Sequence, residues 1–271
     1  YEIRLSLVGS EMCIRDRDTW TQFTMFGQVV ILLLIQVGGL GLVTLTSFFA
    51  LAAKRRMGFR DLRLLGESVS ASGYSQATEV LKIVIRLAFL FEAIGIVLLA
   101  FAFVPQFGLE GIWISIFTAI SAFCNAGFDL FGHFSSLTAF QNEPLVLLTI
   151  STLIVLGGTG FAVLGEVTRQ RFQWRELSLH SRLVLGMTGV LLLMGMTFFC
   201  LTEWRNPATL GGISGAGNKL VNALMQSTTM RTAGFNSVDL ASMRQSSKLM
   251  SIILMSVSYT HLRAHETKAN L

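Results

Sequence analysis

The chain has 271 residues, of which 52% are hydrophobic and 14% charged, and its formal net charge is +5. This apolar, charge-poor composition excludes a soluble domain with one large core and indicates a membrane protein. The basic residues flank long apolar runs, so the positive charge does not indicate a nucleic-acid partner, and membrane lipid is the expected surrounding.

Both ends depart from this pattern. Residues 1–17 (YEIRLSLVGSEMCIRDR) and 257–271 (VSYTHLRAHETKANL) resemble translated sequencing-adapter read-through, so we expect them to be artefacts and exclude them from the fold argument. The three cysteines, Cys13, Cys124 and Cys200, have no spacing typical of a metal site or a disulfide framework, which predicts isolated thiols.

The first apolar runs are long enough to cross a bilayer, which takes about 20 residues. Residues 29–53 form one, with a Gly-Gly-Leu-Gly cluster at 38–41, and the basic loop 54–79 follows. Residues 80–104 form the next, with Glu92 in the middle. An acid at that depth is a candidate for function, and a tie to a neighbouring helix is an equally open interpretation.

Residues 109–123 are apolar but too short to cross, and they lead directly into Cys-Asn-Ala-Gly-Phe at 124–128. A half-helix followed by a re-entrant loop has this pattern. Residues 144–167 are expected to cross again, and they carry a second glycine cluster at 157–160. We expect both glycine clusters to be helix-packing surfaces, because they lie inside apolar runs.

After a second basic loop at 169–182, the arrangement recurs. Residues 183–201 cross, residues 218–230 form a second half-helix, and Arg-Thr-Ala-Gly-Phe follows at 231–235. Another apolar run begins near Lys248.

The recurrence predicts the architecture, because such repeats pack around a shared axis. We expect an all-α transmembrane fold of repeated helix–pore half-helix–helix units around a central pore, like the repeats of two-transmembrane potassium channels. The end of repeat 1 is expected at 18–53, repeat 2 at 80–168 and an incomplete repeat 3 at 183–256, so the pore is expected to be truncated.

Lys and Arg crowd residues 54–63 and 169–182 and are absent from 104–143. The positive-inside rule makes the crowded loops cytoplasmic, and both Ala-Gly-Phe loops then enter from the outer face of a multi-pass protein. The outer acids Asp129, Glu143 and Glu203 either raise the local cation concentration or are ordinary solvated charges.

The Ala-Gly-Phe loops suit a desolvated cation. Backbone carbonyls replace its water shell, and glycine permits the extended geometry that aims them at a pore axis. The carboxyl end of the preceding half-helix adds partial negative charge. The positive charge of Arg231 would oppose a cation, so we expect its side chain to point away and to hold the loop by hydrogen bonds.

An enzyme alternative rests on Gly212-Ile213-Ser214-Gly215, which matches the serine motif of rhomboid-type intramembrane proteases. A serine nucleophile needs a base. His180 is expected across the membrane from Ser214, and His133 is expected in an outer loop, so the catalytic geometry is not predicted.

The two loops together resemble the second and third filter segments of the Trk/Ktr/HKT superfamily of cation transporters, and residues 18–41 resemble the part that follows the first filter in the Ktr membrane subunit. The resemblance implies potassium uptake across the cytoplasmic membrane of a bacterium, with sodium as a coupling ion in several Ktr systems and no cofactor in this chain. It implies a homodimer on a ring of cytoplasmic nucleotide-binding regulatory subunits. The implied potassium ligands are the backbone carbonyls of Asn125, Ala126, Gly127, Phe128, Thr232, Ala233, Gly234 and Phe235, with Cys124 and Arg231 as filter support.

The same resemblance places a first filter segment before Asp18, and a gating loop and fourth repeat after Met255. We therefore expect this polypeptide, as written, not to conduct on its own. A sodium-conducting relative is the alternative within the superfamily, because a serine replaces the first filter glycine in some members.

Overall fold

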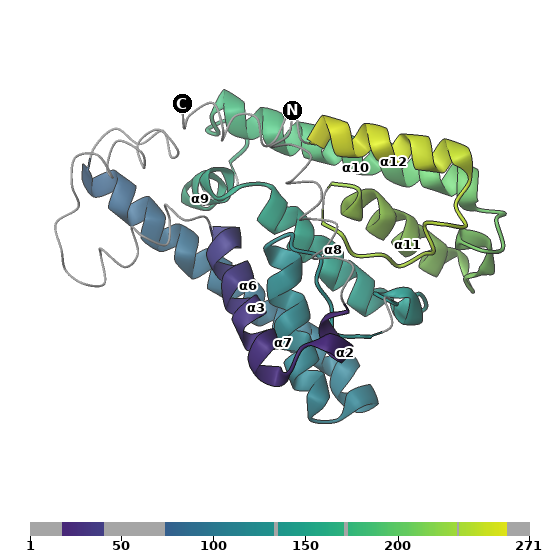
Figure 1. The fold of residues 1–271 in the computed structure, drawn as a ribbon. Coiled ribbons are helices and arrows are strands. Elements are labelled where there is room, and N and C mark those ends of the chain that lie inside the picture. Colours follow the sequence, from purple (N-terminus) through teal and green to yellow (C-terminus); the bar gives the residue numbers. More distant parts are fainter. Residues whose placement is uncertain (1–17, 41–73, 133–134, 171–172, 232, 259–271) are drawn as a thin grey trace, which may run out of the picture.

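The computed structural model describes residues 18–40, 74–132, 135–170, 173–231 and 233–258. All regular elements within these ranges are helical (Figure 1). Their bounds are α2 Thr19–Gln22, α3 Met25–Leu40, α6 Tyr74–Phe107, α7 Glu110–Phe123, η1 Thr138–Phe140, α8 Pro144–Gly158, α9 Phe161–Arg169, α10 Leu179–Glu203, η2 Leu210–Gly212, α11 Ala216–Thr229 and α12 Gln245–Ser258.

Two described helices, over Ile83–Phe107 and Leu179–Glu203, have the length and hydropathy to cross a membrane. A third crossing results if the bent pair α8 and α9 is counted as one span. The helices Met25–Gly39 and Glu110–Phe123 are apolar and shorter. The predicted span at 29–53 continues outside the described residues.

The span predicted over 144–167 is broken in the structure. α8 ends at Gly158, and the chain turns by 97° before Val163–Arg169. Thr159 caps α8, and Gly160 has φ +89°, a conformation that favours glycine. The glycine-rich segment 157–160 therefore ends α8, in addition to its expected role as a helix-packing surface.

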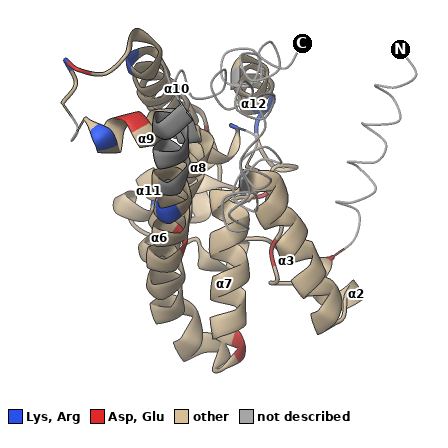
Figure 2. Cartoon of the chain, turned by 90° about the vertical axis from the view of Figure 1, so that its left-hand side faces the viewer, with Lys and Arg blue, Asp and Glu red and all other residues tan. Residues whose placement is uncertain are grey.

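α9 is held beside the start of α10 by the carboxylate of Glu166. That carboxylate accepts hydrogen bonds from the backbone N–H of Ser178 at 2.5 Å, from the Ser178 hydroxyl at 2.8 Å and from the Ser181 hydroxyl. Basic residues gather at α9 and at the neighbouring end of α10 (Figure 2). Their positions agree with the predicted basic loop at 169–182.

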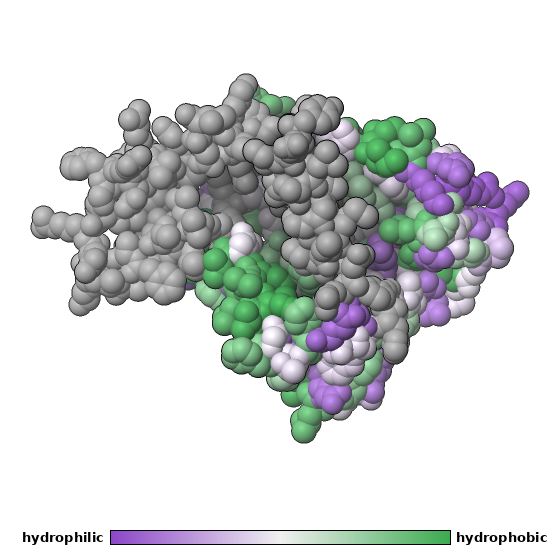
Figure 3. Space-filling view, viewed as in Figure 1, coloured by the Kyte–Doolittle hydropathy of each residue, from purple (hydrophilic) through white to green (hydrophobic). Residues whose placement is uncertain are grey.

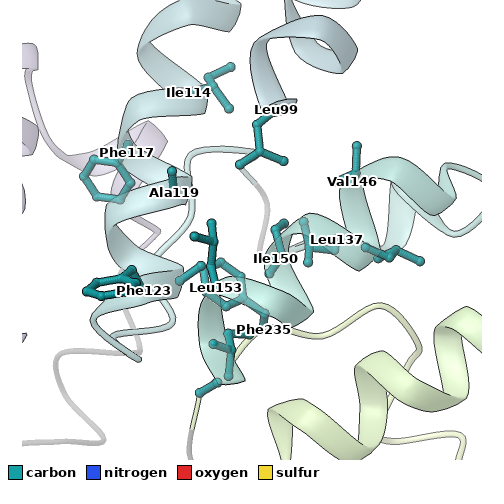
Figure 4. Close-up of a cluster of buried hydrophobic side chains, with 14 of the residues drawn as sticks. Leu99, Ile114, Phe117, Ala119, Phe123, Leu137, Val146, Ile150, Leu153 and Phe235 are labelled. Atoms are coloured by element: carbon teal, nitrogen blue, oxygen red, sulfur yellow. The ribbon is translucent and has the colours of Figure 1, made fainter. Parts of the chain in front are cut away.

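Apolar side chains make two main cores. The larger one joins α3, α6, α7 and α8, and it includes Ala233 and Phe235 from the loop after α11. Figure 4 shows Phe235 among side chains of α7 and α8. The second core lies between α10, α11 and α12, and includes Phe199 and Leu254. The loop after α11 is thus inserted into the packing of the preceding helices.

Many large apolar side chains remain exposed on the long helices, such as Phe101 and Leu193. Figure 3 shows apolar surface over the lower middle of the molecule and hydrophilic residues gathered at its right-hand end, where the loops after α10 and α11 lie in Figure 1. An apolar outer surface of this kind is expected of helices that face lipid.

Candidate functional site

Both Ala-Gly-Phe segments follow a short helix directly. α7 ends at Phe123, immediately before the first loop (residues 124–128), and α11 ends at Thr229, just before the second loop (residues 231–235). These ends match the predicted ends at 123 and 230 within one residue.

The first loop is held by Ser121, in the last turn of α7. The Ser121 carbonyl accepts from the backbone N–H of Ala126 at 2.9 Å, and its hydroxyl accepts from the backbone N–H of Phe128 at 2.9 Å. Asn125 and Gly127 adopt left-handed conformations, with φ of 53° and 71°. Ser121 thereby fixes the loop at Ala126, which lies between the two left-handed residues, and at Phe128, which follows them. No role for Ser121 follows from the Ala-Gly-Phe pattern alone.

The second loop is fixed in a related way. The backbone N–H of Arg231 donates to the Thr228 carbonyl at 3.1 Å, and that of Ala233 donates to the Thr229 carbonyl at 3.1 Å. Gly234 has φ +89°, and the Ala233 and Phe235 side chains are fully buried. Thr232, a predicted ligand, lies outside the described residues.

The structure brings the two loops together. A Cβ built on Gly127 would meet the carbonyl oxygen of Ala233 and lie 2.9 Å from the Cα of Gly234. Only a residue without a side chain fits there, because both neighbours are backbone atoms. The two predicted filter glycines are therefore direct neighbours.

Hydrogen bonds join the segments that follow the two loops. The backbone N–H of Leu137 donates to the Asn236 carbonyl at 2.9 Å, and the backbone N–H of Asn236 donates to the Ser136 hydroxyl at 3.1 Å. The Gln141 amide donates to the Ser237 carbonyl at 2.7 Å. This seam was not predicted, because the residues that form it are short polar loop residues with no motif of their own.

Glycines of both clusters pack directly against the first loop and the end of α7. A Cβ on Gly157 would overlap the carbonyl oxygen of Phe123, and one on Gly158 would lie 2.9 Å from Nδ2 of Asn125. Gly39 packs on Cys124: its Cβ would meet Sγ and lie 2.5 Å from the Cβ of that cysteine. The prediction that the clusters are packing surfaces is confirmed for these glycines, and the surface that they pack is the loop itself.

Gly38 and Gly39 offer a matched pair of substitutions. Gly39→Ala is expected to displace Cys124 and to lower both the thermal stability and the transport of the full-length protein, because overpacking of this kind costs about 1–3 kcal/mol. Gly38→Ala is expected to be neutral or stabilising, since no heavy atom of the described residues beyond its own helix backbone lies within 4 Å of its Cβ position. Thermal unfolding of both variants in detergent checks this, and equal midpoints would contradict the packing.

Arg231 is buried, and its Nη2 donates to the Thr188 hydroxyl on α10 at 3.2 Å. Its side chain therefore holds the second loop to a long helix, as the sequence predicted. Its Nε has no hydrogen-bond partner among the described residues.

Polar atoms without partners are concentrated around this site. All seven buried side-chain atoms that lack a hydrogen bond within the described ranges belong to α7, α11 or the loops after them. They are Thr118 Oγ1, Asn125 Oδ1, Asn222 Oδ1, Gln226 Oε1, Thr229 Oγ1, Arg231 Nε and Ser237 Oγ. Such groups are rare in packed interiors and are typical of functional regions.

The outer acids differ from one another. Glu203 is 1% exposed, and its carboxylate accepts from Asn206, Thr209, Ser247 and the backbone N–H of Arg244. The interpretation of Glu203 as an ordinary solvated charge is therefore wrong, because its carboxylate is buried among four hydrogen-bond donors that tie loops together. Its effect on the local cation concentration stays a prediction. Asp129 is partly buried beside the first loop, and burial raises its pKa.

The hydrogen-bond partner of the serine in the protease motif is an asparagine. The Ser214 hydroxyl donates to Oδ1 of Asn142 at 3.0 Å. His180 lies in the first turn of α10, and Ser214 follows the other end of this 25-residue helix, which is about 37 Å long. His133 lies outside the described residues.

A family model for cation transport proteins, TrkH, matches residues 10–261. The chain belongs to the TrkH family of cation transport proteins. It is therefore a membrane protein of a transporter family, as its apolar helices indicate. Relatives of the chain are named as potassium uptake proteins.

Three bacterial relatives match most of the chain. It is 38% identical over 243 residues to the Ktr system potassium uptake protein B of Vibrio alginolyticus, covering 88% of this chain and 52% of that protein. It is 37% identical over 239 residues to the Bacillus subtilis protein of the same name, covering 88% and 53%. It is 36% identical over 236 residues to the potassium/sodium uptake protein NtpJ of Enterococcus hirae, covering 86% and 51%. The chain spans about half the length of the curated relatives that it matches.

Proposed function

We propose that this TrkH-family chain is part of a potassium uptake protein of a bacterial cytoplasmic membrane. In this proposal potassium is the transported ion, and it is coordinated by backbone carbonyls of Asn125–Phe128 and Thr232–Phe235. The observation that carries the proposal is the contact between the two Ala-Gly-Phe loops at Gly127, Ala233 and Gly234. The names of the Ktr relatives support potassium as the ion.

The pore architecture belongs to the same proposal. A long helix, a short helix, a loop and a further helix occur in that order from α6 to α8 and again from α10 to α12. This order supports repeat 2 at 80–168 and repeat 3 at 183–256, with the end of repeat 1 at 18–53. Since the relatives are about twice as long, the remaining filter segments are proposed to come from further repeats.

The partners are proposed from the relatives' names. Those names describe a Ktr system, which supports an assembly of several subunits. We propose a homodimer on a cytoplasmic nucleotide-binding regulatory subunit, with the basic loops at 54–79 and 169–182 facing that subunit. Sodium is the proposed coupling ion.

The test is ion uptake by the full-length protein, encoded by the complete gene recovered from the source locus. Expressed in a bacterial strain without its own potassium uptake systems, the protein is expected to restore growth at low potassium and to accumulate rubidium as a tracer. Absence of uptake from folded, membrane-inserted protein would overturn the proposal.

A sodium-conducting protein is the second candidate, and the potassium/sodium uptake protein NtpJ favours it. Sodium accumulation without potassium accumulation in the same cells would select it. For the protease alternative, Ser214→Ala is the discriminating variant: a pore is expected to keep its uptake, since the Ser214 hydroxyl bonds to Asn142, outside the two Ala-Gly-Phe loops.

A further inference from the structure

Glu92 lies within α6, in the stretch that is long enough to span the membrane, and it is 3% exposed. A carboxyl group at that depth is costly unless it is paired, and such residues usually have a role. Nothing in the proposed coordination of potassium uses Glu92 directly.

The partner of Glu92 comes from a different part of the chain. Nε2 of Gln36, on α3, donates to both carboxyl oxygens of Glu92, at 3.0 and 3.2 Å. Because an amide donates only through its nitrogen and accepts only through its oxygen, this contact turns Oε1 of Gln36 away from Glu92.

That oxygen faces the base of the first loop. Sγ of Cys124 donates to Oε1 of Gln36 at 3.9 Å. Gly39, one turn further along α3, leaves no room for a side chain beside the same cysteine. Glu92 therefore orients Gln36. Through Gln36 and Gly39, α3 restricts the position of Cys124, the residue immediately before Asn125.

The second loop has an anchor of the same kind at the matching position. Arg231, which like Cys124 is the first residue of its loop, donates to Thr188 on α10. In both loops, the residue at the base is bonded to a polar side chain of a longer helix.

We propose that Glu92 is a positioning residue for the first loop, acting through Gln36 on Cys124, and that it sets the affinity of the pore for potassium. The inference rests on the proposed function. Removing the carboxyl group frees the Gln36 amide to rotate. Cys124 then loses its fixed contact with Gln36, and the loop carbonyls are held less firmly, while the rest of the pore is unchanged.

The experiment measures rubidium uptake against external potassium in the full-length protein, with the amount of folded protein in the membrane as reference. Glu92→Leu, which has no acceptor for the Gln36 amide, is expected to raise KM about three- to tenfold, the effect of one lost hydrogen bond, with little change in the maximal rate. The swapped variant Gln36→Glu, Glu92→Gln is expected to restore KM. In the swap, the amide on α6 donates to the new carboxylate on α3, and that carboxylate still accepts from Cys124.

Thr152→Val on α8 is the control, since among the described residues the Thr152 hydroxyl bonds only to the Leu148 carbonyl of its own helix. It is expected to keep the wild-type KM. A wild-type KM in Glu92→Leu would overturn the inference, as would a loss of folded protein at unchanged KM or a swap that leaves KM raised. If the single variant does not accumulate, the swap decides, with a wild-type KM supporting the inference and a raised KM overturning it. Failure of the proposed function is a separate result, since wild-type protein would then show no uptake.

Discussion

Gly127→Ala is expected to lower potassium uptake by the full-length protein by about tenfold or more, per folded molecule. The residue has φ +71°, which costs a residue with a side chain about 1–2 kcal/mol. In addition, the new Cβ would meet the Ala233 carbonyl oxygen, which is itself a proposed potassium ligand. A change of about 1.4 kcal/mol in the transport barrier is a tenfold change in rate. Initial rates of rubidium uptake check this, and Gly127→Val is expected to abolish uptake.

The matched control is Gly108→Ala, in the turn between α6 and α7. Gly108 has φ +62°, close to that of Gly127, but apart from its chain neighbours no heavy atom in the described part of the chain lies within 4 Å of its Cβ position. The Gly108→Ala variant therefore has the backbone strain but leaves the contact between the two loops intact. Its uptake per folded molecule is expected to stay near wild type. If both variants lose uptake equally, strain alone is responsible. If Gly127→Ala or Gly234→Val transports like wild type, the filter assignment fails.

Local signals in the sequence placed the helices well. The half-helices predicted at 109–123 and 218–230 are Glu110–Phe123 and Ala216–Thr229 in the structure. Their length, apolar character and terminal Ala-Gly-Phe depend only on neighbours along the chain, and such properties are visible without a fold. Arg231 was also placed correctly, because a buried guanidinium must find a partner.

Contacts between distant residues were not predictable in the same way. The meeting of Gly127 with Ala233, the seam between Ser136 and Asn236 and the pairing of Glu92 with Gln36 all join separate helices or loops. A single polar residue in an apolar run shows that it needs a partner, but not which one. Glu203 illustrates the limit, since an acid at a helix end has the same local sequence whether solvent or four donors surround it.

The bend after α8 is an intermediate case. The Gly-Gly-Thr-Gly sequence contains a signal for a helix end, because helices commonly end at a glycine with positive φ. Gly160 adopts such a conformation, with φ +89°. The apolar residues on both sides nevertheless favoured one continuous span. The structure has a bent pair of helices there, and the hydrogen bonds of Glu166 to Ser178 and Ser181 hold α9 beside α10.

Gly157→Ala is expected to lower the thermal midpoint of the full-length protein by several degrees and to remove most of its uptake. The added Cβ would overlap the carbonyl oxygen of Phe123 and lie 2.8 Å from its carbonyl carbon. These are backbone atoms at the last residue of α7, so they cannot rotate away as a side chain does. α7 and α8 must separate, at a cost of about 1–3 kcal/mol, and 1 kcal/mol corresponds to about 2–4 °C in a protein of this size.

Gly189→Ala on α10 is the control for the helix itself. Gly189 is inside a helix like Gly157, but within the described ranges its Cβ position has no heavy atom within 4 Å outside its own helix backbone. Alanine is therefore expected to add about 1 kcal/mol of helix propensity without a clash. Thermal unfolding followed by fluorescence-detected size-exclusion chromatography, with rubidium uptake on the same samples, separates the two. A Gly157→Ala protein as stable as Gly189→Ala would show that α8 does not press on the end of α7. Because Phe123 is the last helical residue before the first loop, a Gly157→Ala protein that folds but does not transport would show instead that this contact sets the position of the loop.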